Sequence, residues 1–194
     1  NEILFKMNSN LNWSMVEELG DQKIYEFNNA HCNCIYSKIE KPVDYKEDDI
    51  LDVITNINGY NSIIKNNSLT TSLIEIENDT IYAYQIIENS IPFVRDRQYI
   101  FKMYSIGQNH IEWMILNKES DFLIPYLDDE IKTLSVGAGS WSFRYENNQK
   151  ILVNKIYVDD EVNLPGLFIN KLKRNNVVQI FNDVLNYVKK QEGE

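Results

Sequence analysis

The stretch that decides the fold is "IPFVRDRQYIFKMYSI", residues 91–106. A proline and an Arg-Asp-Arg triplet come directly before an apolar, aromatic-rich run with a period of two. This alternation is typical of a β-strand with one buried face. The sequence therefore predicts an apolar strand that begins beside a dense group of charges.

Similar runs lie on both sides of this strand. Short turns at Asn78-Asp79, Gly107-Gln108-Asn109 and Asn147-Asn148 separate them, and such residues tolerate positive φ. The turns predict three consecutive hairpins, formed by residues 69–77 with 80–87, 97–106 with 110–116, and 130–146 with 150–158. Residues 23–27 and 34–40 predict a fourth pair. The middle of the chain thus predicts an antiparallel meander.

Helical periodicity occurs in three places. Apolar residues at Ile50, Val53, Ile54 and Ile57 follow the acidic residues 47–49, which favours a short helix ending at Asn58-Gly59. A weaker helix is predicted over residues 10–19. The longest predicted helix begins near Pro165, is interrupted at Asn175-Asn176, and carries an apolar stripe: Val177, Phe181, Val184, Leu185 and Val188.

These elements predict an α+β fold, in which a strongly curved antiparallel sheet wraps around a long C-terminal helix. The 194 residues are expected to form a single domain. A sheet this large, closed by one helix, tends to leave an interior wider than side chains fill. The fold therefore predicts an internal ligand cavity.

Composition excludes several functions. The net charge of −10 disfavours binding to nucleic acid and to anionic surfaces, and no apolar run is long enough to cross a bilayer. Two histidines and the Cys32-x-Cys34 pair predict neither a metal site nor a catalytic triad, and no cofactor is expected. Residues 137–140, Gly-Ala-Gly-Ser, lie inside a strand pattern, so a β-bulge or tight bend is expected there. The chain opens without a methionine, so both the cytoplasm and secretion after leader removal stay open.

Three stretches resemble the START family of lipid-transfer domains. Pro92, Arg95 and Asp96 followed by Tyr99 are similar to the family's entry into a central strand. "VDDEVNLPGLFINKLKRNN", residues 158–176, resembles its passage into the last helix. "VITNINGYNSII", residues 53–64, resembles an early helix, although Ile63 or Ile64 replaces the usual tryptophan. The resemblance covers residues 13–190 and implies the helix-grip fold and the non-catalytic binding of a hydrophobic molecule, usually a lipid.

The strand alternation and this resemblance together predict the residues of a binding cavity. From the sheet we expect Tyr82, Tyr84, Tyr99, Phe101, Met103, Trp113, Trp141 and Phe143, and from the last helix Phe168 and Leu172. Arg95 either holds an anionic headgroup or only pairs with neighbours to stabilise its loop. Which face of each strand is concave stays open at this stage.

The connection formed by residues 117–129 is unusually apolar, with Phe122, Leu123, Ile124, Tyr126 and Leu127 between two strands. It is interpreted as a plug over the open end of the sheet, as a gate for the ligand, or as both. Lys171, Lys173 and Arg174 form a basic group that could make transient contact with an anionic bilayer.

Two classes of function follow from these patterns. The first is a carrier or sensor that binds a lipid or other hydrophobic ligand without catalysis. The second is an aromatase/cyclase-like enzyme acting on a hydrophobic substrate in the same cavity, for which Arg95, Asp96, His110 or a tyrosine would supply acid-base groups.

Overall fold

The computed structural model describes residues 12–27, 34–65, 68–88, 95–117, 124–159 and 166–193. The side chains of residues 34, 35, 124 and 166–173 are left out of the description.

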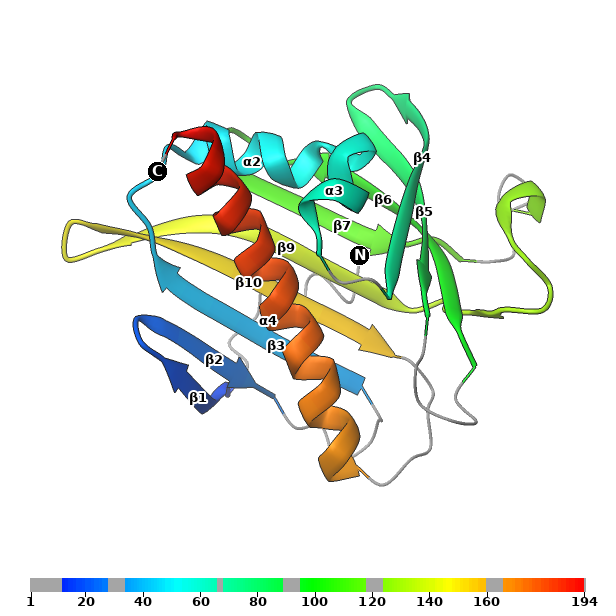
Figure 1. The fold of residues 1–194 in the computed structure, drawn as a ribbon, viewed down its shortest axis with the longest axis horizontal. Helices are drawn as coiled ribbons and strands as arrows, with labels where there is room; N and C mark the ends of the chain where they lie inside the picture. Colours follow the sequence, from blue (N-terminus) through cyan, green and yellow to red (C-terminus); the bar gives the residue numbers. More distant parts are fainter. Residues whose placement is uncertain are drawn as a thin grey trace.

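One curved sheet dominates the structure (Figure 1). Its ten strands are β1 (Ser14–Leu19), β2 (Gln22–Glu26), β3 (Cys34–Pro42), β4 (Leu69–Glu77), β5 (Thr80–Ile87), β6 (Arg97–Ser105), β7 (His110–Ile115), β8 (Lys132–Thr133), β9 (Gly137–Glu146) and β10 (Gln149–Asp159). The spatial order is β1-β2-β3-β10-β9-β7-β6-β5-β4. Every pair along this path is antiparallel, whereas the short β8 pairs with β6 in parallel. The predicted meander is confirmed, and β10 joins it to β3.

Two of the predicted hairpin turns have the expected backbone. Asn78 and Asp79 have φ of 46° and 60°, and Asn147 and Asn148 have φ of 51° and 62°. Positive φ at both central residues gives a turn whose twist matches that of the flanking strands. These turns therefore set the register of the β4-β5 and β9-β10 pairs.

The helix predicted over residues 10–19 is wrong. Residues 14–19 form β1, which pairs with β2 through a register shift between Met15 and Glu17. Met15 and Leu19 are 55% and 47% exposed, so their spacing does not mark a helical core face. Strand pairing overrides a weak helical pattern in this segment.

The predictions for residues 130–146 need two corrections. The strand β9 begins only at Gly137, because residues 132–133 form β8 beside β6. Residues 137–140 form no bulge, since their pairing with β10 and β7 runs without a register shift. The two glycines have a different role, described with the cavity below.

The helices lie on the concave side of the sheet (Figure 1). α2 (Glu47–Thr55), a 3-10 turn η1 (Ile57–Gly59) and α3 (Tyr60–Ile63) follow β3, and a second 3-10 turn, η2 (Ile124–Tyr126), precedes β8. α4 (Gly166–Gln191) crosses the sheet diagonally in front of β3, β10 and β9. α4 continues through Asn175 and Asn176, both of which are exposed.

The apolar stripe of α4 forms the centre of the core. Val177, Phe181, Val184, Leu185 and Val188 are all buried, as the sequence predicts. They pack with the inward residues of the sheet and with the buried side chains of α2. α4 therefore closes the concave face of the sheet.

Candidate ligand-binding cavity

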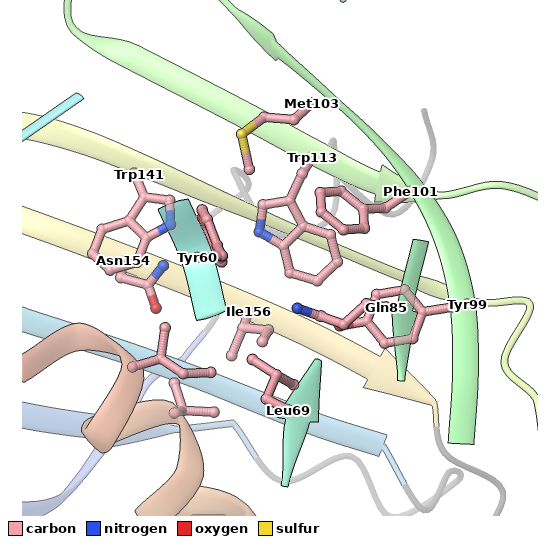
Figure 2. A pocket seen from close by; sticks show the side chains of 12 residues that line it. Tyr60, Leu69, Gln85, Tyr99, Phe101, Met103, Trp113, Trp141, Asn154 and Ile156 are labelled. Carbon is pink, nitrogen blue, oxygen red and sulfur yellow. The ribbon is translucent and has the colours of Figure 1, made fainter. Parts of the chain in front are cut away.

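A cavity of about 80 Å³ lies between the concave face of the sheet and α4 (Figure 2). Five of the predicted residues line it: Tyr99, Phe101, Met103, Trp113 and Trp141. Seven further lining residues were not predicted: Tyr60, Leu69, Gln85, Asn154, Ile156, Val177 and Ile180. The β9-β10 hairpin register could have identified Asn154, which lies directly opposite Trp141. Gln85 lies opposite Tyr99 in the β5-β6 pair, whose register no short turn in the sequence sets.

The β6 strand forms one wall of this cavity. Successive side chains of a strand point to opposite faces, and Tyr99, Phe101 and Met103 all point inward. They are 7%, 4% and 3% exposed. The aromatic-rich run of β6 therefore supplies three consecutive inward positions of the site.

Trp113 lies across a neighbouring glycine. Gly139 of β9 is the direct partner of Trp113 in β7, and a Cβ there would lie 2.6 Å from Trp113 Cζ2. Gly137 similarly leaves room for Ile115, whose Cδ1 would be 2.6 Å from an added Cβ. The glycines of residues 137–140 thus accommodate inward side chains of β7 and shape the cavity wall.

Trp141 connects the sheet to the helix. Its ring stacks on Phe181 of α4, with 5.5 Å between ring centroids and an interplanar angle of 13°. Phe101 meets Trp113 edge to face at 6.1 Å. Such aromatic pairs add stabilisation beyond the area that they bury.

One end of the cavity carries linked polar groups. The Tyr99 hydroxyl donates to Gln85 Oε1, and Gln85 Nε2 donates to Thr71 Oγ1 at 2.6 Å. Burial, together with the neighbouring hydroxyl of Tyr60, raises the pKa of Tyr99. Burial also raises the pKa of Tyr60, whose hydroxyl donates to the Ile54 carbonyl at 2.8 Å. Both phenols therefore hold their protons and act as neutral hydrogen-bonding groups at physiological pH.

Two more polar side chains lie on the concave face near β10. Asn154, which lines the cavity, donates from Nδ2 to the Ser140 carbonyl at 3.2 Å. Ser37 of β3, the direct partner of Ile156, is 1% exposed, and its hydroxyl has no hydrogen-bond partner among the described residues. These groups give the apolar wall additional points for hydrogen bonding.

Tyr82 and Tyr84 do not line the cavity, which corrects that prediction. They pair with Lys102 and Ile100, so they lie on the convex face of the sheet. The Tyr84 hydroxyl donates to Gln98 Oε1 at 2.7 Å. The strand alternation places Tyr82 and Tyr84 on one face, but it does not show whether that face is concave or convex.

Gln98, the hydrogen-bond partner of Tyr84, lies on the same convex face. This fully buried amide accepts from the Asp128 N–H at 2.9 Å and donates to Thr133 Oγ1 at 3.0 Å and to the Ile131 carbonyl at 3.1 Å. It therefore fixes the segment before β9 against β6.

The remaining predicted residues are only partly placed by the structure. Phe143 is buried in the core and faces inward, but it does not line the cavity. Arg95 is exposed directly before β6, outside the lining. Phe168 and Leu172 belong to α4, but their side chains lie outside the description, so their role stays a prediction.

The predicted gate falls largely outside the described residues. Phe122 and Leu123 are not described, and Ile124 is described only in its backbone, as the start of η2. Tyr126 is 43% exposed and Leu127 is half-buried. The interpretation of this connection as a plug or a gate stays a prediction.

Arg174 is not part of an open basic surface. Its guanidinium Nε lies 2.7 Å from Glu26 Oε1, and its Nη1 lies 3.4 Å from Glu17 Oε2. These bonds join α4 to the β1-β2 hairpin. The proposed bilayer contact therefore depends on Lys171 and Lys173, whose side chains are not described.

His110 lies on the convex face, away from the cavity. Its Nε2 is 3.4 Å from Glu112 Oε1, and burial lowers the pKa of the imidazole despite the neighbouring carboxylate. Among the described residues, no group of three or more His, Cys, Asp or Glu is arranged to hold a metal ion. None of the described helices is long and apolar enough to cross a membrane.

Comparison with known proteins agrees with this architecture. No protein-family model and no curated protein sequence matches the chain. A STAR-related lipid transfer protein fragment from Xanthomonas axonopodis superposes with a TM-score of 0.73 at 13% identity, covering 91% of this chain and 98% of that one. The chain has a START-like fold.

Two further solved structures share this fold but differ in function. Human StAR-related lipid transfer protein 5 gives a TM-score of 0.73 at 10% identity, covering 98% of this chain and 93% of that chain. The Zhui aromatase/cyclase from Streptomyces sp. R1128 gives 0.58 at 11% identity, covering 82% and 96%. Lipid-transfer proteins and cyclases thus share this START-like fold, and identities this low establish the fold alone.

Proposed function

We propose that this START-like protein binds a hydrophobic molecule, such as a lipid, in the cavity under α4, for transport or sensing and without catalysis. The observation that carries the proposal is the chemistry of the lining. Aromatic and aliphatic side chains dominate it, and the polar groups are amides and phenols. Such a surface favours an apolar ligand and fixes its orientation through a few hydrogen bonds.

The same lining argues against acid-base catalysis. Of the twelve lining residues that the structure describes, only Tyr60 and Tyr99 titrate, and burial raises the pKa of both. A general base for reaction near neutral pH needs a pKa close to that pH. The lining offers hydrogen-bond donors rather than a base.

The alternative is an aromatase/cyclase-like enzyme, and the shared fold with the Zhui protein supports considering it. In that case Gln85 and Tyr99 would hydrogen-bond to a hydrophobic substrate in the same cavity. Asp96 and His110, proposed from sequence as acid-base groups, are absent from the lining. This chemistry favours a carrier or sensor over an enzyme.

A lipid requires more space than the cavity of about 80 Å³ offers. An engineered cavity of about 150 Å³ binds molecules as small as benzene or xenon. Binding of a lipid therefore requires displacement of lining side chains. The ring of Trp113 occupies the middle of the lining (Figure 2), which makes it a candidate for this movement.

Native mass spectrometry of the purified protein tests the proposal. We expect a mass increment that disappears after organic extraction, and a hydrophobic molecule in the extract. Adding the extracted molecule back should restore the increment without changing the molecule. A protein that neither retains a hydrophobic molecule nor binds added lipids would contradict the proposal, and conversion of the returned molecule would favour the enzyme.

A further inference from the structure

Arg97 places a charged side chain on the cavity side of the sheet. It is the first residue of β6 and shares the inward face with Tyr99, two residues further along. Arg97 is only 7% exposed. Arg95, predicted from the sequence either to hold an anionic headgroup or to stabilise its loop, is exposed instead.

The guanidinium of Arg97 is incompletely paired. Its Nη1 donates to the Arg95 carbonyl at 2.5 Å and to the Asp96 carbonyl at 3.3 Å. Its Nε is buried and has no hydrogen-bond partner in the part of the chain that the structure describes. Within the described ranges, no carboxylate forms an ion pair with Arg97, although Arg144 and Arg174 both have such partners.

A buried positive charge without a counter-charge is unfavourable, because removal from water is not offset by an ion pair. A carboxylate or phosphate would satisfy the unpaired Nε–H, since a guanidinium donates to these anions in a forked geometry. Lys132 of β8, which pairs directly with Arg97 of β6, adds a second positive charge nearby. The local chemistry is therefore that of an anion site.

This site is continuous with the cavity wall. Leu69, which lines the cavity, pairs with Ile87, and Ile87 pairs with Arg97. The inward residues from Arg97 to Met103 span roughly 20 Å at the ordinary rise of a strand. A long molecule could thus extend along β6 with its polar end at Arg97.

We propose that Arg97 binds the anionic group, a carboxylate or a phosphate, of a ligand whose apolar part occupies the cavity. This inference rests on the proposed function, and it narrows the ligand to an anionic amphiphile. Phenol and amide groups at Tyr99 and Gln85 then lie beside the junction of the polar and apolar parts of the ligand.

Binding of matched probes at pH 7.5 tests the inference. Dodecanoate and methyl dodecanoate share the apolar chain and differ in charge. Wild-type protein should bind the carboxylate about tenfold to a hundredfold more tightly than the ester, the range for a hydrogen bond to a charged group. Arg97→Gln should remove this preference and leave the affinity for the ester unchanged, whereas Arg95→Gln, the exposed control, should keep it.

Further outcomes separate the possibilities. Equal binding of both probes to the wild type would overturn the anion site while leaving the hydrophobic cavity intact, and this comparison holds even if Arg97→Gln fails to fold. Equal losses for both probes in Arg97→Gln would show that Arg97 is only structural. Acetate or inorganic phosphate that binds as tightly as dodecanoate would instead show a site for free anions. Failure of the wild type to bind either probe would contradict both the cavity proposal and this inference.

Discussion

At the scale of single residues, the absence of a side chain at Gly139 is as important to the cavity as the rings that line it. Trp113 lies over the backbone of β9 because nothing projects from its partner position. The strand pattern of residues 137–140 indicated a special backbone at these glycines. Their function is instead to provide space.

We expect Gly139→Ala to displace the Trp113 ring. The added Cβ would overlap the indole, and such overpacking costs about 1–3 kcal/mol. Chemical denaturation and tryptophan fluorescence would measure the loss of stability and the altered surroundings of the ring. Ser142→Ala, on the convex face of the same strand, is the control and should be nearly neutral. Unaltered stability and fluorescence in Gly139→Ala would contradict this account of the wall.

Glu40 gives the stability a pH dependence. It lies 2.9 Å from Lys38 and 3.0 Å from Arg144 on the convex face. Burial alone would raise the pKa of Glu40, but Lys38 and Arg144 together lower it below the ordinary value of 4.5. The ionised carboxylate therefore stabilises the folded state above pH 4.5, and this contribution is lost as the pH falls through the folded-state pKa.

We expect Glu40→Gln to lower the free energy of unfolding by about 1 kcal/mol at pH 7, because the partners are partly solvated. The difference from wild type should shrink as the pH falls below 4.5. Urea denaturation at a series of pH values would measure it. The exposed Glu75→Gln serves as a control, and a difference that is constant with pH would show that the ion pairs of Glu40 do not cause it.

At the scale of elements, two polar contacts hold α4 against the rest of the fold. Arg174 joins it to the β1-β2 hairpin, and Asp183 joins it to the segment after α3. Asp183 is 6% exposed, and its Oδ2 accepts from the backbone N–H of Lys65 at 2.8 Å. The helix that covers the cavity is therefore positioned by specific polar contacts as well as by its apolar stripe.

Asp183→Ala should destabilise the protein by about 1–3 kcal/mol, since the Lys65 N–H would lose its acceptor in a partly buried place. Asp183→Asn keeps an acceptor oxygen and should recover part of this loss. Thermal unfolding measures the stability of both variants. Gln179→Ala, at an exposed position of the same helix, is the control and should be as stable as wild type. If Asp183→Ala were as stable as wild type, the bond to Lys65 would not contribute to positioning α4.

At the scale of the whole molecule, one curved sheet separates two chemically different faces. Inward residues of β6, β7 and β9 form an aromatic cavity wall, whereas the convex face carries Tyr84, Gln98 and Glu112. The same substitution can therefore be made once on each face. The inward variant tests ligand binding, and the outward variant controls for an effect on stability.

Met103→Trp should fill the cavity and weaken the binding of a fluorescent fatty acid at least tenfold. The added ring costs about 1–3 kcal/mol of stability through overpacking, so retention of the fold is checked by circular dichroism. Met114→Trp on the convex face of the adjacent strand is the matched control and should bind normally. Equal binding by both variants would show that the ligand does not occupy the wall at Met103.

The sequence by itself determined the meander, the C-terminal helix and the grouping of Tyr99, Phe101 and Met103 on one face of a strand, because these depend on local periodicity and turn residues. Local patterns cannot show which face of a strand becomes concave, so Tyr82 and Tyr84 were misplaced and Gln85 was missed. Only the tertiary structure decided these positions, since curvature and α4 select the inner face through long-range packing. Long-range packing likewise leaves Arg95 exposed and Arg97 buried. It also pairs residues 14–19 with β2, so that they form a strand.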